Sequence, residues 1–577
     1  MKLRTAVAWA FLLPLMGFAV RSQEVGQEAA RPKTILDLQP FRETSKLRVK
    51  GRAGQEGTVT LVNLNPHINA WYLLELKWDG GAGGGTYHLE NPNPGGRKVV
   101  VEQTYPAGIV IFEGHRRYPC EISWGDGPNA FEKGKASPQV YYPLCDGRVY
   151  LRNGATGHRT TLEGATEFLR EHVWGGENII ALGHVLLGDA HRETGKTQAE
   201  GKIARDAQEQ FNDRPLPAMI DGRFASQLLA PGSLGIAIEQ PAPAGLRPGA
   251  WYPAAGNPGV FVSIVQPNLV DTALFKTYTG RVNALDGPEA SALCYWAAFD
   301  LDRFELGFAI GTEHPKVGWS AHMLASMRDP KLPGPDGIGT ISPLAATGLV
   351  SPKDATRTVA TFTGGFKRAH GAFKYGDLAL RNYGTHYGFL EDGVVLSKLQ
   401  PGLSTVFTLD DGTLAMKTWT EADNAVLPRI RDARQNGVPV IEFDPVSKTG
   451  VPGPLVNRWG PGNWSGSQDM KLRTMRSGIA MARNGAKRFL IYSVFTAATP
   501  SAMARVFQAY RCDYAMLLDM NALEHTYFAL YRRSGSRLLV DHLIQQMNTL
   551  DKSVSGELVP RFLGYADNRD FFFVTRR

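Results

Sequence analysis

The chain of 577 residues has few cysteines, no dense block of basic residues and no long apolar run after residue 20. Without a basic block, no segment is suited to follow a nucleic-acid backbone, so we expect no nucleic-acid partner. The formal net charge is +8, of which Lys2, Arg4 and Arg21 belong to the N-terminal segment, so the remainder carries +5. Without a later apolar run of about 20 residues, we expect no transmembrane span in the mature chain.

The four cysteines lack the spacing of a zinc site, and none lies in a motif that marks a catalytic thiol. Cys120 and Cys145 lie close in sequence within a strand-rich region, which favours a disulfide in an exported protein. Cys294 and Cys512 are far apart in sequence, and a bridge or two buried free thiols are equally compatible with the pattern. The sequence also contains no Gly-x-Ser-x-Gly nucleophile elbow.

The first residues have the composition of a secretory signal. Lys2 and Arg4 precede an apolar run over residues 5–20, which is short for a membrane span, and Ser22 suits the last position before a cut. We therefore predict a signal peptide over residues 1–22 and a periplasmic or secreted protein. An uncleaved anchor is the alternative.

Glycine and proline are abundant, with 63 and 36 residues, and predict many turns and short strands. The length predicts two or three domains. Composition divides the chain into a polar linker (23–45), a β-rich, sandwich-like domain (46–155), a helix with a polar linker (156–225) and a second domain (226–577). The helix is expected after a capping box formed by Thr160 and Glu163.

The second domain combines hairpins with a helix that leads into a buried strand. Thr499 and Pro500 form a helix start, and the apolar run that follows the helix ends at Asp519. We therefore expect an α+β protein whose second domain is mixed α/β. Tight hairpin turns are expected at three dipeptides between β-like runs, namely Asp392-Gly393, Asp411-Gly412 and Asn484-Gly485.

Five motifs appear in order over residues 350–535: "FTGGF" (362–366), "LDDG" (409–412), "RQNGVPVIE" (434–442), "MRSGIAM" (475–481) and "MLLDMN" (516–521). In order and spacing the segment resembles the phosphodiester glycosidase family, which includes N-acetylglucosamine-1-phosphodiester α-N-acetylglucosaminidase and bacterial relatives. The resemblance implies a hydrolase that cleaves a sugar-phosphodiester bond, with a carbohydrate or sugar-phosphate substrate in envelope or exopolysaccharide metabolism.

That reaction needs cations or N–H groups around a phosphate and a carboxylate near the anomeric carbon. The glycine pair could offer N–H groups, Arg476 could grip phosphate in bidentate fashion, and Asp519 is the best carboxylate. Trp419 and Trp459 are candidates for stacking on a sugar ring. We predict Asp519, Arg476 and His370 as catalytic residues, and Thr363, Gly364, Gly365, Lys367, Asn521 and Trp419 as substrate-binding residues.

Each of these residues also has an ordinary structural role that the sequence leaves open. Thr363 stands where the family usually has asparagine, and Met520 to Leu523 replace its Gly-Gly-Gly-Ser. The alternative function is therefore a catalytically inactive polysaccharide-binding or envelope-assembly protein. We predict no cofactor and no metal, with a divalent cation near Asp519 as the alternative, and the sequence leaves the oligomeric state open.

Overall fold

The computed structural model describes residues 33–577 except 52–53, 82, 103–107, 121–128, 162, 164–211, 241, 279, 315–316, 320–324, 367–386, 458–472 and 536. The predicted signal peptide, Lys367, His370 and Trp459 therefore lie outside the described residues. So does most of the helix expected after Thr160. The start of that helix is described, and there the Glu163 N–H donates to Oγ1 of Thr160 at 3.1 Å.

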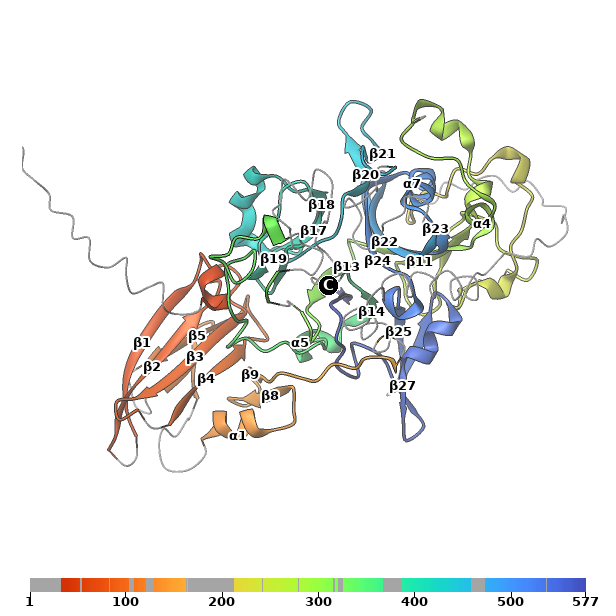
Figure 1. Cartoon of the computed structure of the whole chain (residues 1–577). Helices are drawn as coiled ribbons and strands as arrows, with labels where there is room; N and C mark the ends of the chain where they lie inside the picture. Colours follow the sequence, from red (N-terminus) through yellow and green to blue (C-terminus); the bar gives the residue numbers. More distant parts are fainter. Residues whose placement is uncertain are drawn as a thin grey trace, which may run out of the picture.

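The N-terminal part consists of two antiparallel sheets that share one core, and it forms one end of the molecule (Figure 1). Apolar residues from both sheets, such as Leu74 and Ile111, are buried between them, as period-two alternation along the strands requires. The six-stranded sheet comprises β1 (Glu43–Lys50), β2 (Glu56–Asn63), β3 (Trp71–Trp78), β4 (Gly84–Glu90), β9 (Val149–Arg152) and β8 (Tyr141–Leu144) in that spatial order. The three-stranded sheet comprises β5 (Arg97–Glu102), β6 (Gly108–Glu113) and β7 (Arg116–Cys120).

A disulfide between Cys120 and Cys145 joins the end of β7 to the turn between β8 and β9, which confirms the predicted bridge. The other two cysteines, Cys294 and Cys512, are free and buried. Burial raises the pKa of both thiols well above the usual value.

The largest sheet of the rest of the molecule has eight strands. It contains, in spatial order, β10 (Tyr252–Pro253), β11 (Val260–Val265), β12 (Cys294–Asp300), β23 (Lys487–Ala498), β22 (Thr474–Asn484), β24 (Cys512–Met520), β20 (Pro439–Asp444) and β21 (Thr449–Pro452). The apolar run predicted as a buried strand is β24, which lies inside this sheet and is almost completely buried. Asp519 lies near its C-terminal end.

Three smaller sheets complete the larger part. The first has the order β13 (Phe304–Ala309), β29 (Phe571–Arg576), β14 (Thr358–Thr363), β25 (Phe528–Ser534) and β26 (Arg537–His542). The second has the order β16 (Val394–Ser397), β15 (Phe389–Glu391), β19 (Ile430–Gln435), β17 (Ser404–Leu409) and β18 (Leu414–Thr418). The third is a hairpin of β27 (Lys552–Val554) and β28 (Glu557–Val559). All three predicted dipeptide turns connect hairpins, β15–β16, β17–β18 and β22–β23, and are confirmed.

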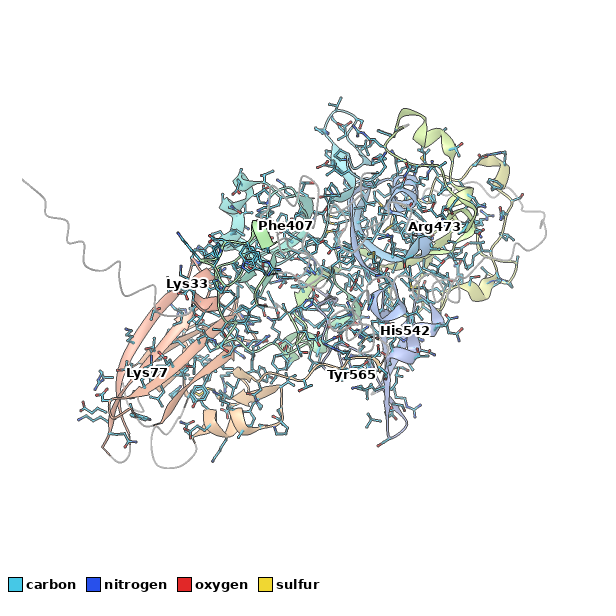
Figure 2. The ribbon with its side chains drawn as sticks, in the orientation of Figure 1. Lys33, Lys77, Phe407, Arg473, His542 and Tyr565 are labelled. Atoms are coloured by element: carbon cyan, nitrogen blue, oxygen red, sulfur yellow. A yellow bond between two sulfur atoms is a disulfide. The ribbon has the colours of Figure 1, made fainter. Side chains whose placement is uncertain are left out.

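The described α-helices are short: α1 (Ala130–Ala136), α4 (Gly287–Ser291), α5 (Pro352–Ala355) and α7 (Pro500–Ala509). Helix α7 begins as predicted, because Oγ1 of Thr499 accepts a hydrogen bond from the Ala502 N–H and Pro500 occupies the first turn. In Figure 2, Lys77 projects from the outer end of the N-terminal sheet, whereas Phe407 lies where the side chains of the larger part are packed.

The expected α+β class with a mixed α/β domain is wrong, because the described residues form six sheets and few helices. The segment β23–α7–β24 has the local order of an α/β unit, and this order suggests the mixed class. In the sheet, however, β22 lies between β23 and β24 and pairs antiparallel with both. A continuous apolar strand is typical of a parallel sheet, but here an antiparallel sheet is covered on both faces.

Part of the segment expected as a linker is ordered against the larger part. Ile35, in a short 3₁₀ helix at Ile35–Leu38, is fully buried in the main core. The amide of Gln39 donates to the Val395 carbonyl at 2.7 Å and accepts from the Val395 N–H at 2.8 Å. Amide donation from Asn65 to the Gly393 carbonyl connects the N-terminal sheet to the same hairpin. No helix among the described residues is long and apolar enough to cross a membrane.

Candidate functional site

The glycine turn after β14 lies against the end of β24. The Asp519 N–H donates to the Gly364 carbonyl at 3.1 Å, and the Gly364 N–H donates to the Asp570 carbonyl at 2.9 Å. The Phe366 N–H donates to the side-chain oxygen of Asn436 at 3.0 Å. The backbone of the turn therefore joins three distant segments of the chain, and the Gly364 N–H predicted to contact phosphate is already used inside the protein.

The two glycines are required by close packing rather than by left-handed backbone, since neither has a positive φ. A Cβ atom at Gly365 would lie 2.6 Å from Oδ1 of Asn436, and one at Gly364 would lie 3.0 Å from Oδ2 of Asp570. A side chain at either position would push against a buried polar group. Close packing inside the protein therefore explains why both positions are glycine, and no bound ligand is needed for that explanation.

Asp519 pairs with an arginine that was not among the residues predicted from the sequence. Asp519 is 5% exposed, and its carboxylate lies 2.5 Å from Nη1 of Arg569. Arg569 precedes the last strand, β29, and is itself buried. Burial alone would lower the pKa of Arg569, but the charges of Asp519 and Glu163 raise it above its ordinary value.

Two further side chains meet the same guanidinium. Nη2 of Arg569 donates to Oε1 of Glu163 at 2.9 Å and lies 2.8 Å from Nε2 of His525. An arginine N–H can only donate, so Nε2 of His525 is the acceptor. Nδ1 of His525 then carries the proton and donates to the Met520 carbonyl at 2.6 Å. The ring is therefore held as the neutral Nδ1–H tautomer beside Asp519.

A second ion pair lies behind the glycine turn. Nε of Arg434 donates to Oδ2 of Asp570 at 2.6 Å, and Nδ1 of His314 lies 2.7 Å from Oδ1 of the same carboxylate. Burial would raise the pKa of Asp570, but Arg434 and His314 more than offset it and hold the value at about 2. Nη2 of Arg434 also donates to the Phe366 carbonyl at 2.6 Å, so the Arg434–Asp570 ion pair also holds the backbone of the glycine turn in place.

Arg476 and Asp519 were both predicted as catalytic residues, and the described contacts place their side chains against different groups. Arg476 is fully buried on β22, where Nε donates to the Ala498 carbonyl at 2.8 Å and Nη1 lies 2.7 Å from the sulfur of Met520. Met520 and Asp519 are consecutive on β24, and their side chains contact different groups. Burial lowers the pKa of Arg476 to about 9, while the charge of Glu289 acts in the opposite direction.

The remaining predicted residues divide between turn and core positions. Thr363 is buried, and its hydroxyl lies 3.4 Å from the Glu524 carbonyl. Asn521 follows β24 with a φ of 89°, a left-handed conformation that asparagine tolerates. Trp419 is 1% exposed, packs edge-on against Phe407 and donates from Nε1 to Asn424, so it fills core space and presents no open ring face for a sugar.

Four residues that contact Asp519, its partner Arg569 or the glycine turn were not predicted from the sequence: Arg569, Glu163, His525 and Asp570. A signal was present in "DNRD" (567–570), a charged tetrapeptide placed directly before the apolar "FFFV" of the last strand. Charged residues at the start of a buried strand need partners, and here Asp519 near the end of β24 pairs with Arg569, while Arg434 on β19 pairs with Asp570. No group of three or more histidine, cysteine or acidic side chains suited to hold a metal ion occurs among the described residues.

Comparison with solved structures shows a distant similarity. No protein-family model matches the chain, and no curated protein matches it. Among solved structures, the catalytic domain of zebrafish N-acetylglucosamine-1-phosphodiester α-N-acetylglucosaminidase, auto-inhibited by its pro-peptide, has 12% identity and a TM-score of 0.29. The match covers 56% of this chain and 85% of that one. With so low a TM-score, the similarity does not establish a shared fold or a shared family.

Proposed function

We propose that the protein is an exported hydrolase that cleaves a sugar-phosphodiester bond, with its reacting groups at the end of β24. The observation that carries this proposal is the meeting of a carboxylate, a guanidinium and a neutral imidazole in one cluster, formed by Asp519, Arg569 and His525. The ordered motifs of residues 350–535 support the same reaction class. Envelope or exopolysaccharide metabolism is the proposed setting.

The chemistry assigns a role to each member of the cluster. A phosphodiester anion competes with carboxylates for a guanidinium, which binds phosphate in bidentate fashion. Binding of the substrate phosphate to Arg569 would thus release the Asp519 carboxylate to face the anomeric carbon. Nε of Arg569 has no hydrogen-bond partner among the described residues, so it is a further donor for a phosphate oxygen.

The leaving group determines how much acid catalysis the site needs. A phosphate monoester leaves as a stable anion, unlike a sugar alcohol, so one carboxylate to stabilise positive charge at the anomeric carbon is sufficient. His525, with an unprotonated Nε2, is placed to accept a proton from the attacking water once Arg569 has turned to the phosphate. Glu163 keeps the guanidinium anchored during this exchange.

The test is release of sugar from chromogenic hexose-1-phosphodiesters by the full chain. We expect Asp519→Asn and Arg569→Lys each to lower kcat/KM by about 100-fold or more, since each removes a group that acts in the transition state. Arg483→Lys, at an exposed pair with Asp513, is the matched control and should leave turnover unchanged. Unchanged turnover in both cluster variants would remove the assignment.

A second candidate function is favoured by the closed state of the cluster. Asp519 is paired with Arg569 and nearly inaccessible, and Thr363 and Asn521 differ from the motif cores of the family the sequence resembles. A non-catalytic polysaccharide-binding or envelope-assembly protein would show saturable glycan binding without any turnover. The same purified chain distinguishes the two functions in one pair of assays.

A further inference from the structure

Arg561 connects the two segments of the chain that carry His525 and Arg569. It is 3% exposed and forms a bidentate pair with Asp567, in which Nε donates to Oδ2 at 2.7 Å and Nη2 donates to Oδ1 at 2.9 Å. Nη1 donates to the Glu524 carbonyl at 2.6 Å. One guanidinium therefore holds the residue directly before His525 and, through Asp567, the loop that leads to Arg569.

Asp567 extends this connection to the backbone of Arg569. Oδ1 of Asp567 also accepts a hydrogen bond from the Arg569 N–H at 3.0 Å. The backbone of Asp567 is itself fixed, because its N–H donates to the Gly348 carbonyl at 2.9 Å and its carbonyl accepts from the Thr312 N–H at 3.0 Å. A Cβ atom at Gly348 would clash with the Asp567 carbonyl oxygen, so this loop is also closely packed. The Arg569 side chain therefore projects from a backbone that is held on several sides.

The Glu524 carbonyl is the point at which Arg561 acts on His525. Glu524 and His525 are consecutive residues of a short 3₁₀ helix that follows β24. The His525 ring donates from Nδ1 to the Met520 carbonyl at 2.6 Å and accepts at Nε2 from Arg569 at 2.8 Å. Both hydrogen bonds of the ring depend on where this helix lies. A fixed Glu524 carbonyl therefore helps to determine which ring nitrogen carries the proton.

The backbone next to Arg561 has an unfavourable conformation that its surroundings maintain. Phe562 has a φ of 67°, a region that aromatic residues rarely adopt. Its ring is fully buried and stacks on Phe571, the first residue of β29, with 4.3 Å between the ring centroids. The Phe562 carbonyl accepts from the Val350 N–H at 2.8 Å, and the Arg561 N–H donates to Oδ1 of Asp551 at 3.0 Å. Backbone strain of this kind persists only where the surrounding structure fixes it, and it is frequent at functional sites.

We propose that Arg561 and Asp567 are positioning residues, which keep His525 in its Nδ1–H tautomer and hold the backbone of Arg569 in place. The inference rests on the proposed function for its effect on turnover, whereas the tautomer can be measured without turnover. Because the pair acts on the backbone, the Arg569 side chain can still turn from its carboxylate partner to a substrate phosphate. Lysine cannot replace Arg561 in this role, because an ammonium group lacks the planar fork that spans Asp567 and the Glu524 carbonyl.

The first measurement is NMR spectroscopy of the full chain labelled with ¹³C-histidine, in which the ring Cδ2 shift reports the tautomer. The signal of His525 is assigned with His525→Gln. We expect the Nδ1–H tautomer in the natural chain, and a mixture of tautomers in Arg561→Lys and in Asp567→Asn. An Nδ1–H signal that persists in both variants overturns the proposal. The natural chain alone can also refute it, by showing the Nε2–H tautomer.

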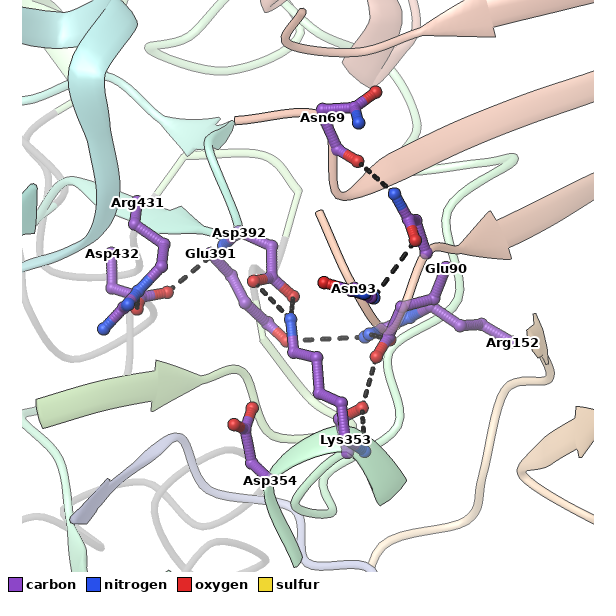
Figure 3. A network of polar contacts seen from close by, with 12 residues as sticks. Asn69, Glu90, Asn93, Arg152, Lys353, Asp354, Glu391, Asp392, Arg431 and Asp432 are labelled. Carbon is purple, nitrogen blue, oxygen red and sulfur yellow. Dashed lines mark hydrogen bonds and ion pairs between the residues drawn. The ribbon is translucent and has the colours of Figure 1, made fainter. Parts of the chain in front are cut away.

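Arg152→Lys is the matched control for the loss of a buried arginine. Arg152 is also 3% exposed, and it contacts Glu90 at 2.5 Å and Glu391 at 3.4 Å where the N-terminal sheet meets the larger part (Figure 3). This change should lower the temperature of unfolding, as Arg561→Lys does, and leave the His525 signal unchanged. Equal changes of the His525 signal in the two variants would indicate a general loss of packing and contradict the proposal.

The second measurement is the hydrolase assay with hexose-1-phosphodiesters. Arg561→Lys should lower kcat by about 10-fold and change KM by less than about twofold, because Asp567 still holds the Arg569 backbone while His525 is misplaced. An unchanged kcat in Arg561→Lys overturns the positioning role. Absence of turnover in the natural chain removes the proposed hydrolase instead, and the positioning pair is then confirmed or refuted by the His525 signal.

Discussion

Asp570 and Arg434 form a fully buried ion pair, with 2.6 Å between Oδ2 and Nε, across 136 positions of sequence. Removing one partner would leave an uncompensated charge in the core. We therefore expect Asp570→Asn to lower the free energy of unfolding by about 3–5 kcal/mol. Chemical denaturation at neutral pH measures this change.

The control for that prediction is Asp513→Asn, which breaks an exposed pair and should change the free energy of unfolding by less than about 1 kcal/mol. The double variant Asp570→Leu with Arg434→Met should recover part of the loss, because neither charge of this pair is then left buried without its partner. Equal losses for Asp570→Asn and Asp513→Asn would contradict the buried-pair argument.

Glu391 should make the protein less stable as the pH rises. Its pKa in the folded state, about 8, is above the ordinary value because of burial and the nearby Asp392 and Asp432, although Arg152 acts in the opposite direction. The folded state therefore holds a proton that the unfolded state has lost. The contribution of Glu391 to the free energy of unfolding is complete below about pH 4.5 and is lost as the pH rises through 8. Over this range the free energy of unfolding falls by no more than about 1.4 kcal/mol per pH unit.

The measurement is the free energy of unfolding between pH 5 and 9 for the natural chain and for Glu391→Gln. Glutamine keeps an oxygen for the Ile310 N–H, which now donates to Oε2 of Glu391 at 2.9 Å. The difference between the two curves should vary with pH in this window. Parallel curves would show that Glu391 is ionised throughout.

Gly365→Ala should destabilise the protein by about 1–3 kcal/mol, because the new Cβ would lie 2.6 Å from the Asn436 side chain. Gly364→Ala should cost less, since its nearest contact is 3.0 Å. Gly154→Ala, at an exposed position with no neighbour within 4 Å, is the control. Thermal unfolding compares the three, and the reverse order of the two turn variants would contradict the packing explanation.

The Cys120–Cys145 bridge closes a loop with a sequence separation of 25, and its removal by the double change to alanine should cost about 3 kcal/mol. The loss should fall on the N-terminal sheets. Thiol titration of the natural chain should detect no reactive thiol in the folded state and two after denaturation without reductant, corresponding to Cys294 and Cys512. Four thiols would mean that the bridge does not form.

Local features of the sequence predicted local structure well. The three dipeptide turns, the start of α7 and the burial of β24 follow from backbone preferences and apolar pattern over a few residues, which the sequence displays directly. The disulfide could also be predicted, because both cysteines belong to one strand-rich segment.

The pairing of strands and of charged residues that are far apart in sequence could not be predicted. The pairing of β22 with β24 is encoded by no local pattern, and the expected mixed α/β class was wrong because the described residues form six sheets and few helices. The site shows the same limit: Asp519 lies at the end of a buried strand, as the apolar run predicts, but its partner Arg569 lies 50 positions away, and the nearer candidate Arg476 contacts Met520 instead.

The place of β29 in its sheet has a consequence for the order of folding. The last strand of the chain, Phe571–Arg576, lies between β13 and β14, and pairs with both. These two strands are made hundreds of residues earlier and do not pair with each other in the sheet order. The larger part therefore cannot close until synthesis has passed Arg576, and a chain that stops before Phe571 would keep β13 and β14 as open edges.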